Sequence, residues 1–216
     1  MLRKLLLLLV FALVSACSSG GGGELPAGPD LMKKSAEAMK AVKSAAFSIS
    51  TDGKPKVPVK KADGRLTAAG DGDGTITIDL PLGGLQEITF ALVGDTVHFR
   101  GPTGGFQKMT RKDLAQIYDP SLILDPGKGL AHLLASATDP RVEAEEDGAY
   151  RVATTFSGQV LGTLVPGVTQ GVNATVWVDT ASSRLTKVSL PLQDGTVTVT
   201  LRDYDVPVTV TPPPAG

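Results

Sequence analysis

The sequence contains little of the chemistry from which most active sites and metal centres are built. It has one cysteine, Cys17, and two histidines, His98 and His132. A lone cysteine excludes an intramolecular disulfide, so an exported domain must gain its stability from a packed core. Neither histidine has a histidine or cysteine nearby at ligand spacing, which argues against a metal site. Both are interpreted as structural, with His98 on the solvent-facing side of a strand, opposite Val97 and Phe99.

An excess of charge of one sign is also missing. The 21 Lys and Arg residues balance the 22 Asp and Glu residues, for a net charge of −1. A nucleic-acid partner is therefore not expected, because it requires a clustered basic surface. Basic residues do gather between positions 33 and 65, and residues 143–147 form an acidic run. The basic side could face anionic lipid headgroups, or both could be ordinary solvated surface.

Sequence motifs of common enzymes are absent as well. There is no G-x-S-x-G elbow, no P-loop and no dinucleotide-binding fingerprint. The segment 70–74 (Gly-Asp-Gly-Asp-Gly) resembles part of a calcium loop but lacks the closing glutamate, so it is interpreted as a turn. Asp119 and Asp125 could pair as acid and base, but each precedes a proline, which is typical of a helix cap. The sequence thus predicts no catalytic residue, no metal, no cofactor and no enzyme activity.

The longest hydrophobic run stands at the N-terminus. Arg3 and Lys4 precede an apolar stretch over residues 5–14, and Val14-Ser15-Ala16-Cys17 follows at once. This order predicts a lipoprotein signal peptide over residues 1–16 and lipidation of Cys17, with the protein anchored on the extracytoplasmic face of the cell membrane. A transmembrane helix, or a signal peptide with a chance cysteine, is the alternative. The Gly/Ser-rich stretch that follows predicts a flexible tether over residues 17–29.

The rest of the chain predicts one α+β domain over residues 30–210 and an extended Pro-rich tail over 211–216. Asp30 is expected to cap a helix that begins at Leu31 and ends between residues 44 and 46. Two further helices are expected in the middle of the chain, at 112–118 and 129–135. Alternating residues separated by turn signals predict antiparallel strands: from Phe47 onward, at 75–80, around 88–92 and 97–99, and at 150–156, 174–178, 185–190 and 197–201.

These elements predict one twisted antiparallel sheet with helices gathered on its concave face. If the helices and the sheet do not close tightly, an apolar cavity suited to acyl chains would lie between them. The same residue types would equally form an ordinary core, and the pattern alone does not separate the two.

Four segments resemble the mycobacterial and actinobacterial LppX/LprA/LprF/LprG lipoprotein family, and its LprG-like branch most closely. They are LMKKSAEAMKAVKSAAFSIS (31–50), ITFALVGDTVHF (88–99), IYDPSLILDPGKGLAHLLA (117–135) and ATVWVD (174–179). The third segment is the most specific. The resemblance implies a strongly curved half-barrel sheet whose concave face and helices enclose a large hydrophobic cavity.

The resemblance also implies a function. Family members bind lipids with several acyl chains, such as triacylated glycolipids or triacylglycerol, and carry them from the plasma membrane toward the outer envelope without catalysis. The LprG-like branch implies a major-facilitator transporter as a partner. Mapped onto this sequence, the cavity-lining residues are Met39, Val42, Ile76, Ile78, Leu80, Ile88, Phe90, Leu92, Val97, Phe99, Ile117, Leu130, Leu133 and Leu134.

Three hypotheses follow from the sequence. The leading one is a membrane-anchored lipid carrier. The second is an envelope scaffold or chaperone that binds a transporter and carries no lipid. The third, an enzyme acting on cell-wall lipids, would need a nucleophile and a base close together, and the sequence offers no such pair.

Overall fold

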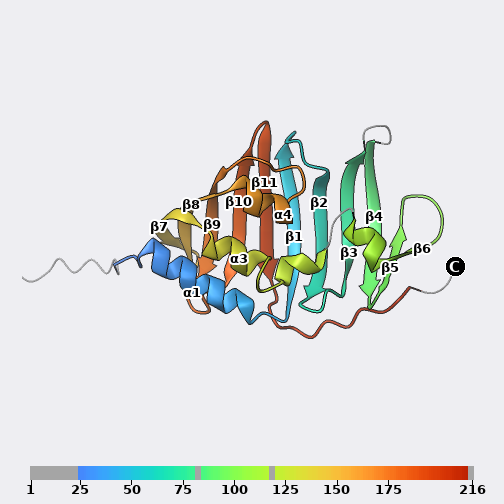
Figure 1. Ribbon diagram of the computed structural model, residues 1–216, viewed down its shortest axis with the longest axis horizontal. Coiled ribbons are helices and arrows are strands. Elements are labelled where there is room, and N and C mark those ends of the chain that lie inside the picture. Colours follow the sequence, from blue (N-terminus) through green and yellow to red (C-terminus); the bar gives the residue numbers. More distant parts are fainter. Residues whose placement is uncertain (1–23, 81–83, 117–119, 214–216) are drawn as a thin grey trace, which may run out of the picture.

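The computed structural model describes residues 24–80, 84–116 and 120–213, and these form an open 11-stranded antiparallel sheet with helices on one face (Figure 1). The helices are α1 (Gly28–Lys40), α2 (Arg111–Ala115), the 3₁₀ helix η1 (Pro120–Leu124), α3 (Leu130–Ala135) and α4 (Gly158–Leu164). The strands are β1 (Ser44–Gly53), β2 (Val59–Thr67), β3 (Gly72–Leu80), β4 (Gly84–Val93), β5 (Thr96–Arg100), β6 (Gln107–Thr110), β7 (Thr138–Glu146), β8 (Ala149–Phe156), β9 (Val172–Asp179), β10 (Leu185–Leu192) and β11 (Gly195–Arg202).

The strand order is β6-β5-β4-β3-β2-β1-β11-β10-β9-β8-β7. Two stacks of hairpins, one from each half of the chain, therefore meet where the first strand pairs with the last. In that central pair Phe47 lies opposite Leu201 and Ile49 lies opposite Val199. The α+β class and the single antiparallel sheet predicted from the sequence are confirmed.

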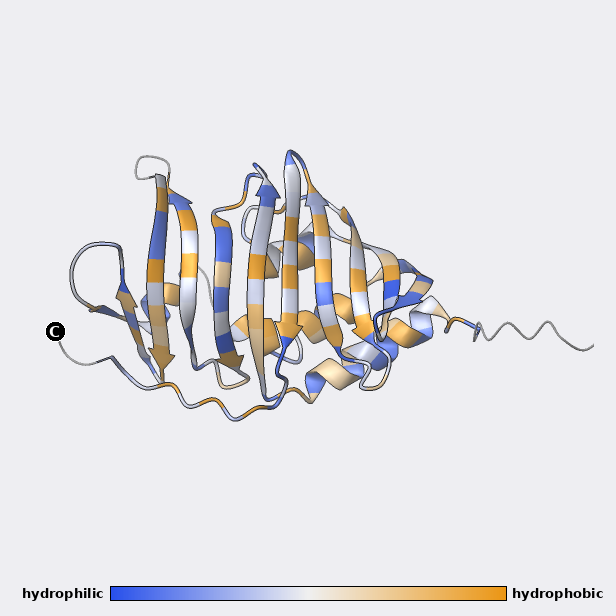
Figure 2. Ribbon diagram, turned by 180° about the vertical axis from the view of Figure 1, so that it is seen from behind, coloured by the Kyte–Doolittle hydropathy of each residue, from blue (hydrophilic) through white to orange (hydrophobic). Residues whose placement is uncertain are grey.

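The two faces of the sheet differ sharply. The face turned toward the helices, called here the concave face, carries the core: Val152, Val176 and Val188 of β8, β9 and β10 lie side by side on it and are buried. Seen from the opposite side, the strands show alternating polar and apolar bands (Figure 2). This is the pattern of strands with one dry face and one wet face.

Helix α1 differs from its prediction at both ends. It begins at Gly28 with Ala27 as N-cap residue, so Asp30 lies in the first turn and is not the cap. It ends at Lys40, and the expected end between residues 44 and 46 is wrong. Ala45 and Ala46, which favour a helix intrinsically, instead pair with β2 and β11. Sheet pairing on both sides overrides local helix propensity here.

Four elements are absent from the prediction. Strand β2 was missed because Lys61, Asp63 and Arg65 interrupt its apolar residues; they all point to the outer face. The acidic run at residues 143–147, where no strand was expected, lies mostly in the edge strand β7, whose register shifts twice against β8. The short strand β6 and the helix α4 were missed as well.

The prediction for His98 is half correct. Its side chain does lie on the face opposite Val97, but it is buried, with 5% exposure, and is not solvent-facing. Its register neighbour Ala91 is buried too, so this part of the outer face is covered. Among the described residues, the His98 Nδ1 atom has no hydrogen-bond partner.

The helices cover the sheet unevenly. Helices α1 and α3 pack on each other, α1 also contacts β7, and Leu161 of α4 is fully buried in the core. Helix α2 packs on β5 and β6, and η1 packs on β2. The expected helix 112–118 is described only to its end at Ala115, and the helix expected at 129–135 is confirmed as α3. No helix in the described part of the chain is both long and apolar enough to span a membrane.

Candidate functional site

The eight sheet residues predicted to line a cavity share one face. Strand register places Ile76 opposite Ile88, Leu92 opposite Val97, and Phe90 opposite Phe99. Since directly opposed residues point to the same side of an antiparallel sheet, the set forms one continuous apolar surface. Ile76 and Phe90 pack against the hydrophobic core, which places this surface on the concave face.

Burial divides the predicted lining into groups. Seven of its residues are almost fully buried: Met39, Val42, Leu130, Leu133 and Leu134, which belong to the main core cluster, and Leu92 and Val97, which lie outside it. Five are half-buried and remain partly open to solvent, and they are called here the apolar strip: Ile76, Ile78, Ile88, Phe90 and Phe99. Leu80, at the end of β3, is 43% exposed. Ile117 lies outside the described residues.

The apolar strip stays open because the helices sit mainly on the other half of the sheet. Figure 1 shows α1, α3 and α4 in front of the strands from β7 to β1, while β3 and β4 have no helix in front of their upper halves. In the middle of the adjacent strand β2 the concave face carries only Ala62 and Gly64, and the Phe47 ring closes over Gly64, where an added Cβ would lie 3.0 Å from the ring. The core therefore ends near β2 and the strip begins beyond it.

Arg111 fixes one end of the helical segment that flanks the strip. Its Nε atom donates to the Gly94 carbonyl at 2.9 Å, Nη1 donates to the Ala69 carbonyl at 3.3 Å, and Nη2 lies 3.0 Å from Asp71 Oδ1. One guanidinium thus ties the beginning of α2 to the β2–β3 and β4–β5 turns. The Thr110 hydroxyl caps α2 by accepting a hydrogen bond from the Asp113 N–H.

Asp125 fixes the other end of this segment. Its Oδ1 atom accepts hydrogen bonds from the backbone N–H groups of Gly127 and Lys128, both at 2.8 Å. The carboxylate therefore caps a turn that precedes α3, as its position before proline indicated, although the residue at the α3 N-cap is Gly129. Asp119, the other predicted cap, lies outside the described residues.

The shifted pKa values of Tyr204, Asp179 and Asp205 are explained by burial and by local hydrogen bonds. Burial raises the pKa of Tyr204, whose hydroxyl donates to the Leu185 carbonyl. Hydrogen bonds from Ser182 lower the pKa of Asp179, and a hydrogen bond from the Lys43 backbone N–H lowers that of Asp205. Within the described ranges, no three His, Cys, Asp or Glu residues come together in a way that could hold a metal ion. The apolar strip can remove apolar groups of a ligand from water by contact with its side chains.

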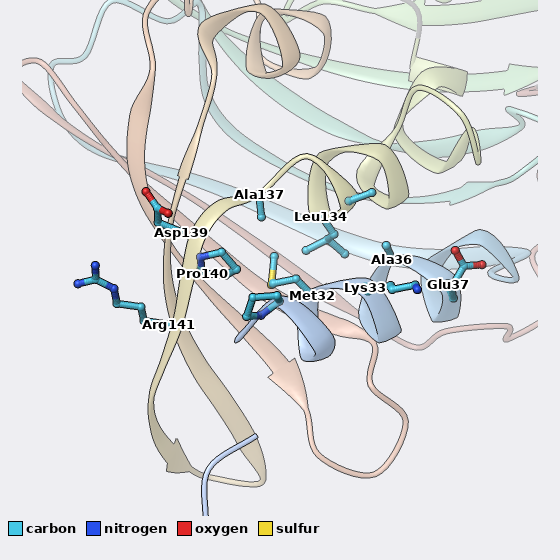
Figure 3. A pocket seen from close by; sticks show the side chains of 11 residues that line it. Met32, Lys33, Ala36, Glu37, Leu134, Ala137, Asp139, Pro140 and Arg141 are labelled. Carbon is cyan, nitrogen blue, oxygen red and sulfur yellow. The ribbon is translucent and has the colours of Figure 1, made fainter. Parts of the chain in front are cut away.

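A pocket of about 560 Å³ lies away from the strip, between α1, α3 and β7 (Figure 3). Lys33 and Glu37 of α1, Leu134 of α3, and Asp139, Pro140 and Arg141 of β7 contribute to its lining. Pro140 faces α1, while the Asp139 and Arg141 side chains point away from the helices (Figure 3). Sequence reasoning missed this pocket because the course of β7 is hidden by its charged residues.

A second pocket, of about 770 Å³, lies between the β1–β2 loop and the β3–β4 hairpin. Its lining was not predicted either. The sequence shows the lysines of the loop only as part of a basic stretch, since nothing local in it places them beside β3 and β4.

Comparison with known proteins gives one consistent result. The family model described as LppX_LprAFG lipoprotein matches residues 27–210. The relative named lipoarabinomannan carrier protein LprG in Mycobacterium tuberculosis (strain ATCC 25618 / H37Rv) is 32% identical over 215 residues, covering 94% of this chain and 90% of the relative. The protein of the same name in Mycolicibacterium smegmatis is 32% identical, with coverage of 94% and 92%.

Two solved structures share the fold. The crystal structure of LprF from Mycobacterium bovis matches with a TM-score of 0.75 at 22% identity, covering 87% of this chain and 97% of the other. That of the lipoprotein LppX from Mycobacterium tuberculosis matches with a TM-score of 0.63 at 21% identity, covering 86% and 100%. Both likenesses support the same open, helix-covered antiparallel sheet.

Proposed function

The chain belongs to the LppX_LprAFG lipoprotein family, and from this premise we propose that it is a lipid carrier that binds acyl chains on the concave face of β3, β4 and β5. The observation that carries the proposal is the apolar strip. Its five large side chains point to the dry side of the sheet, yet each remains partly exposed to solvent.

The energetics of such a surface favour a lipid ligand. Removing apolar surface from water contributes about 25 cal/mol per Å², or about 0.8 kcal/mol for each buried methylene. An acyl chain laid along the strip would remove apolar surface on both partners at once. Several chains on one ligand would share a single cost of association, so lipids with several chains are the favoured cargo.

The relatives named lipoarabinomannan carriers suggest the class of cargo. We assign this chain multi-acyl lipids or glycolipids, such as triacylated glycolipids or triacylglycerol, moved from the plasma membrane toward the outer envelope. The carrier acts by binding and release and catalyses no reaction. A major-facilitator transporter is the proposed membrane partner.

Lipidation completes the proposal. Residues 1–16 are assigned as the signal peptide, Cys17 as the acylated residue and 17–29 as the tether of an extracytoplasmic, membrane-anchored protein. The lipid-binding domain is assigned to 30–210 and the tail to 211–216. Replacement of Cys17 by serine is expected to abolish metabolic labelling of the protein with radioactive palmitate. Labelling of that variant at the parent level would contradict this assignment.

The test of the carrier function uses a chain that begins at residue 24. This chain retains every described element from α1 to β11 and the whole described core. Lipids extracted from the purified protein are identified and quantified by mass spectrometry. We expect acylated lipids at a fixed molar ratio to protein, and protein purified without bound lipid would contradict the proposal.

A matched pair of variants locates the binding surface. Ile76→Asn places an amide on the strip, while Thr77→Asn places the same amide on the outer face one residue later. We expect Ile76→Asn to carry several-fold less lipid and Thr77→Asn to carry the parent amount, with circular dichroism confirming that both fold. Equal lipid in the two variants would exclude the strip as the binding surface.

The same preparation tests the alternative function. A scaffold or chaperone for a transporter would purify without lipid and would still bind the transporter after delipidation. If Thr77→Asn lost transporter binding and Ile76→Asn kept it, the scaffold function would be favoured. The surface that binds the transporter would then lie on the outer face of the sheet.

A further inference from the structure

Two exposed leucines stand together at one edge of the sheet, beyond the end of the apolar strip. Leu80 is 43% exposed and Leu85 is 64% exposed, and they lie on the paired ends of β3 and β4. Leu80 points to the concave face and continues the line of Ile76 and Ile78 along β3. Leu85, opposite Asp79, points to the outer face. The hairpin thus presents an apolar side chain on each side.

The neighbouring β1–β2 loop is held against this hairpin. The Asp79 backbone N–H donates to the Pro58 carbonyl at 2.9 Å, and Lys60 Nζ lies 3.9 Å from Asp79 Oδ2. Lys60 Nζ also donates to the Pro55 carbonyl at 3.2 Å. Pro55 itself is fully buried. The loop and the hairpin therefore form one connected surface, and the pocket of about 770 Å³ lies between them.

Positive charge lines that pocket. Lys54, Lys56 and Lys60 contribute to its lining together with Leu85, and Asp79 is the single acidic residue among them. Lys54 and Lys56 are exposed. Asp52 and Asp194 lie at the same edge, where the Lys54 backbone N–H bonds the Asp194 carbonyl, but neither residue lines the pocket. The hollow therefore carries net positive charge beside an exposed leucine.

We infer that this edge, defined by Lys54, Lys56, Lys60, Leu80 and Leu85 and called here the docking edge, binds the surface of a bilayer that contains anionic phospholipid. Exposed leucines beside lysines match the two parts of a membrane interface. The leucines enter the acyl boundary and the ammonium groups contact lipid phosphates.

The position of the docking edge gives this contact a purpose that rests on the proposed function. Leu80, Ile78 and Ile76 form an apolar line from the docking edge to the strip. A domain docked in this way would hold the open end of the strip against the bilayer. An acyl chain could then pass from membrane to protein with little exposure to water.

The experiment measures co-sedimentation of the chain beginning at residue 24 with vesicles. One set of vesicles is pure phosphatidylcholine, and the other contains phosphatidylglycerol at three parts in ten. We expect binding to the second set that weakens with added salt, since exposed charges are screened. Equal binding to both sets, or binding to neither, would overturn the inference.

Variants assign the binding to the docking edge. Lys54→Glu with Lys56→Glu is expected to weaken binding to the anionic vesicles at least about twenty-fold, at about fivefold for each lysine lost. Leu85→Ser is expected to weaken it about tenfold. The controls are Lys108→Glu and Val206→Ser, which change an exposed lysine and a 52% exposed valine elsewhere. If Lys108→Glu weakened vesicle binding as much as the double lysine variant, or Val206→Ser as much as Leu85→Ser, the assignment to the docking edge would be overturned.

The lipid content of the same variants separates this inference from the carrier function. We expect Leu85→Ser to lose vesicle binding while retaining its co-purified lipid, and Ile76→Asn to lose lipid while retaining vesicle binding. A failure of one result leaves the other proposal standing. An acidic protein partner would instead be indicated by docking-edge variants that bind vesicles normally but lose activity in transfer between membranes.

Discussion

Arg111 Nη2 lies 3.0 Å from Asp71 Oδ1, and this ion pair joins two parts of the chain that are forty residues apart. The Asp71 carboxylate also accepts a hydrogen bond from the Gly94 N–H at 2.9 Å. The Gly70 backbone passes so close that a Cβ there would lie 2.1 Å from Arg111 Nη1. The guanidinium is thus enclosed by the turns that it connects, and it sets where α2 begins.

Replacement of Arg111 by alanine is therefore expected to lower the free energy of unfolding by about 1–3 kcal/mol, because three acceptors lose a partly buried donor. Urea denaturation measures the change. Lys112→Ala, at an exposed neighbouring position, should leave stability within about 0.5 kcal/mol of the parent. An Arg111→Ala protein as stable as its parent would show that the turns hold α2 without this side chain.

A second prediction concerns the packing of α1 on the edge of the sheet. A Cβ at Gly28 would lie 1.9 Å from the Pro140 carbonyl oxygen on β7, closer than any real contact. Gly28→Ala should then displace the beginning of α1 and destabilise the domain by about 1–3 kcal/mol. The matched control is Gly101→Ala, where a Cβ meets open space. Similar thermal midpoints for the two variants would refute the close approach.

The buried phenol of Tyr204 is expected to make the folded domain less stable at alkaline pH. Burial raises the pKa of its phenol, Arg184 opposes the rise, and Asp205 adds to it. A raised pKa in the folded state means that the unfolded chain ionises first, so stability is intact below about pH 10 and declines as the pH rises beyond it. Tyr204→Phe should cost about 1 kcal/mol at pH 7 through its lost hydrogen bond and should flatten that alkaline decline. Stability curves of equal slope above pH 10 would exclude this role.

Asp205 is expected to make the stability of the folded domain decrease at acid pH. The Lys43 backbone N–H and the Arg184 guanidinium both bond its carboxylate and lower its pKa. Its contribution is present above about pH 4 and is lost as the pH falls through the lowered pKa. Asp205→Asn should therefore reduce the loss of stability between neutral and acid pH. Asparagine suits the positive φ of 61° there, so backbone strain does not confuse the comparison.

The neighbouring Asp203 supplies the control for that measurement. It also has a positive φ, of 52°, and its carboxylate forms an ion pair with the exposed Arg202 at 3.5 Å. Asp203→Asn is expected to keep the acid profile of the parent. If both variants flatten the profile equally, the bonds made by Asp205 are not its source.

The sequence predicted the faces of the sheet better than its strands. Alternation grouped Ile88 with Phe90 on one face of a strand, the family resemblance implied that Ile76 shares their surface, and the strand register places all three on the same side. It missed β2 and β7 because a strand with a wet outer face can carry charged residues at every second position or at a bulge. Ala45 and Ala46 misled for a different reason, since their helix propensity yields to the pairing of β1 with two neighbours.

The candidate site shows where reasoning from one strand ends. Leu92 and Phe90 are two residues apart on the same face, and no local signal separates them. The structure buries Leu92 to 2% exposure and leaves Phe90 half-buried, because burial depends on which helices pass over each position. The docking edge was missed for the same reason: Lys56 and Leu85 are brought together only by the pairing of β2 with β3 and β3 with β4.

The pairing of β1 with β11 also constrains how the molecule can be made. The two strands at the centre of the sheet come from opposite ends of the chain, so a polypeptide emerging from a ribosome or a translocation channel lacks the central seam until its last strand appears. Until then each half exposes an unpaired edge. Long-range pairing of this kind is slow and leaves such edges open to aggregation. Completion of the sheet thus depends on β11, and a chain truncated before residue 195 would leave β1 and β10 without the strand that joins them.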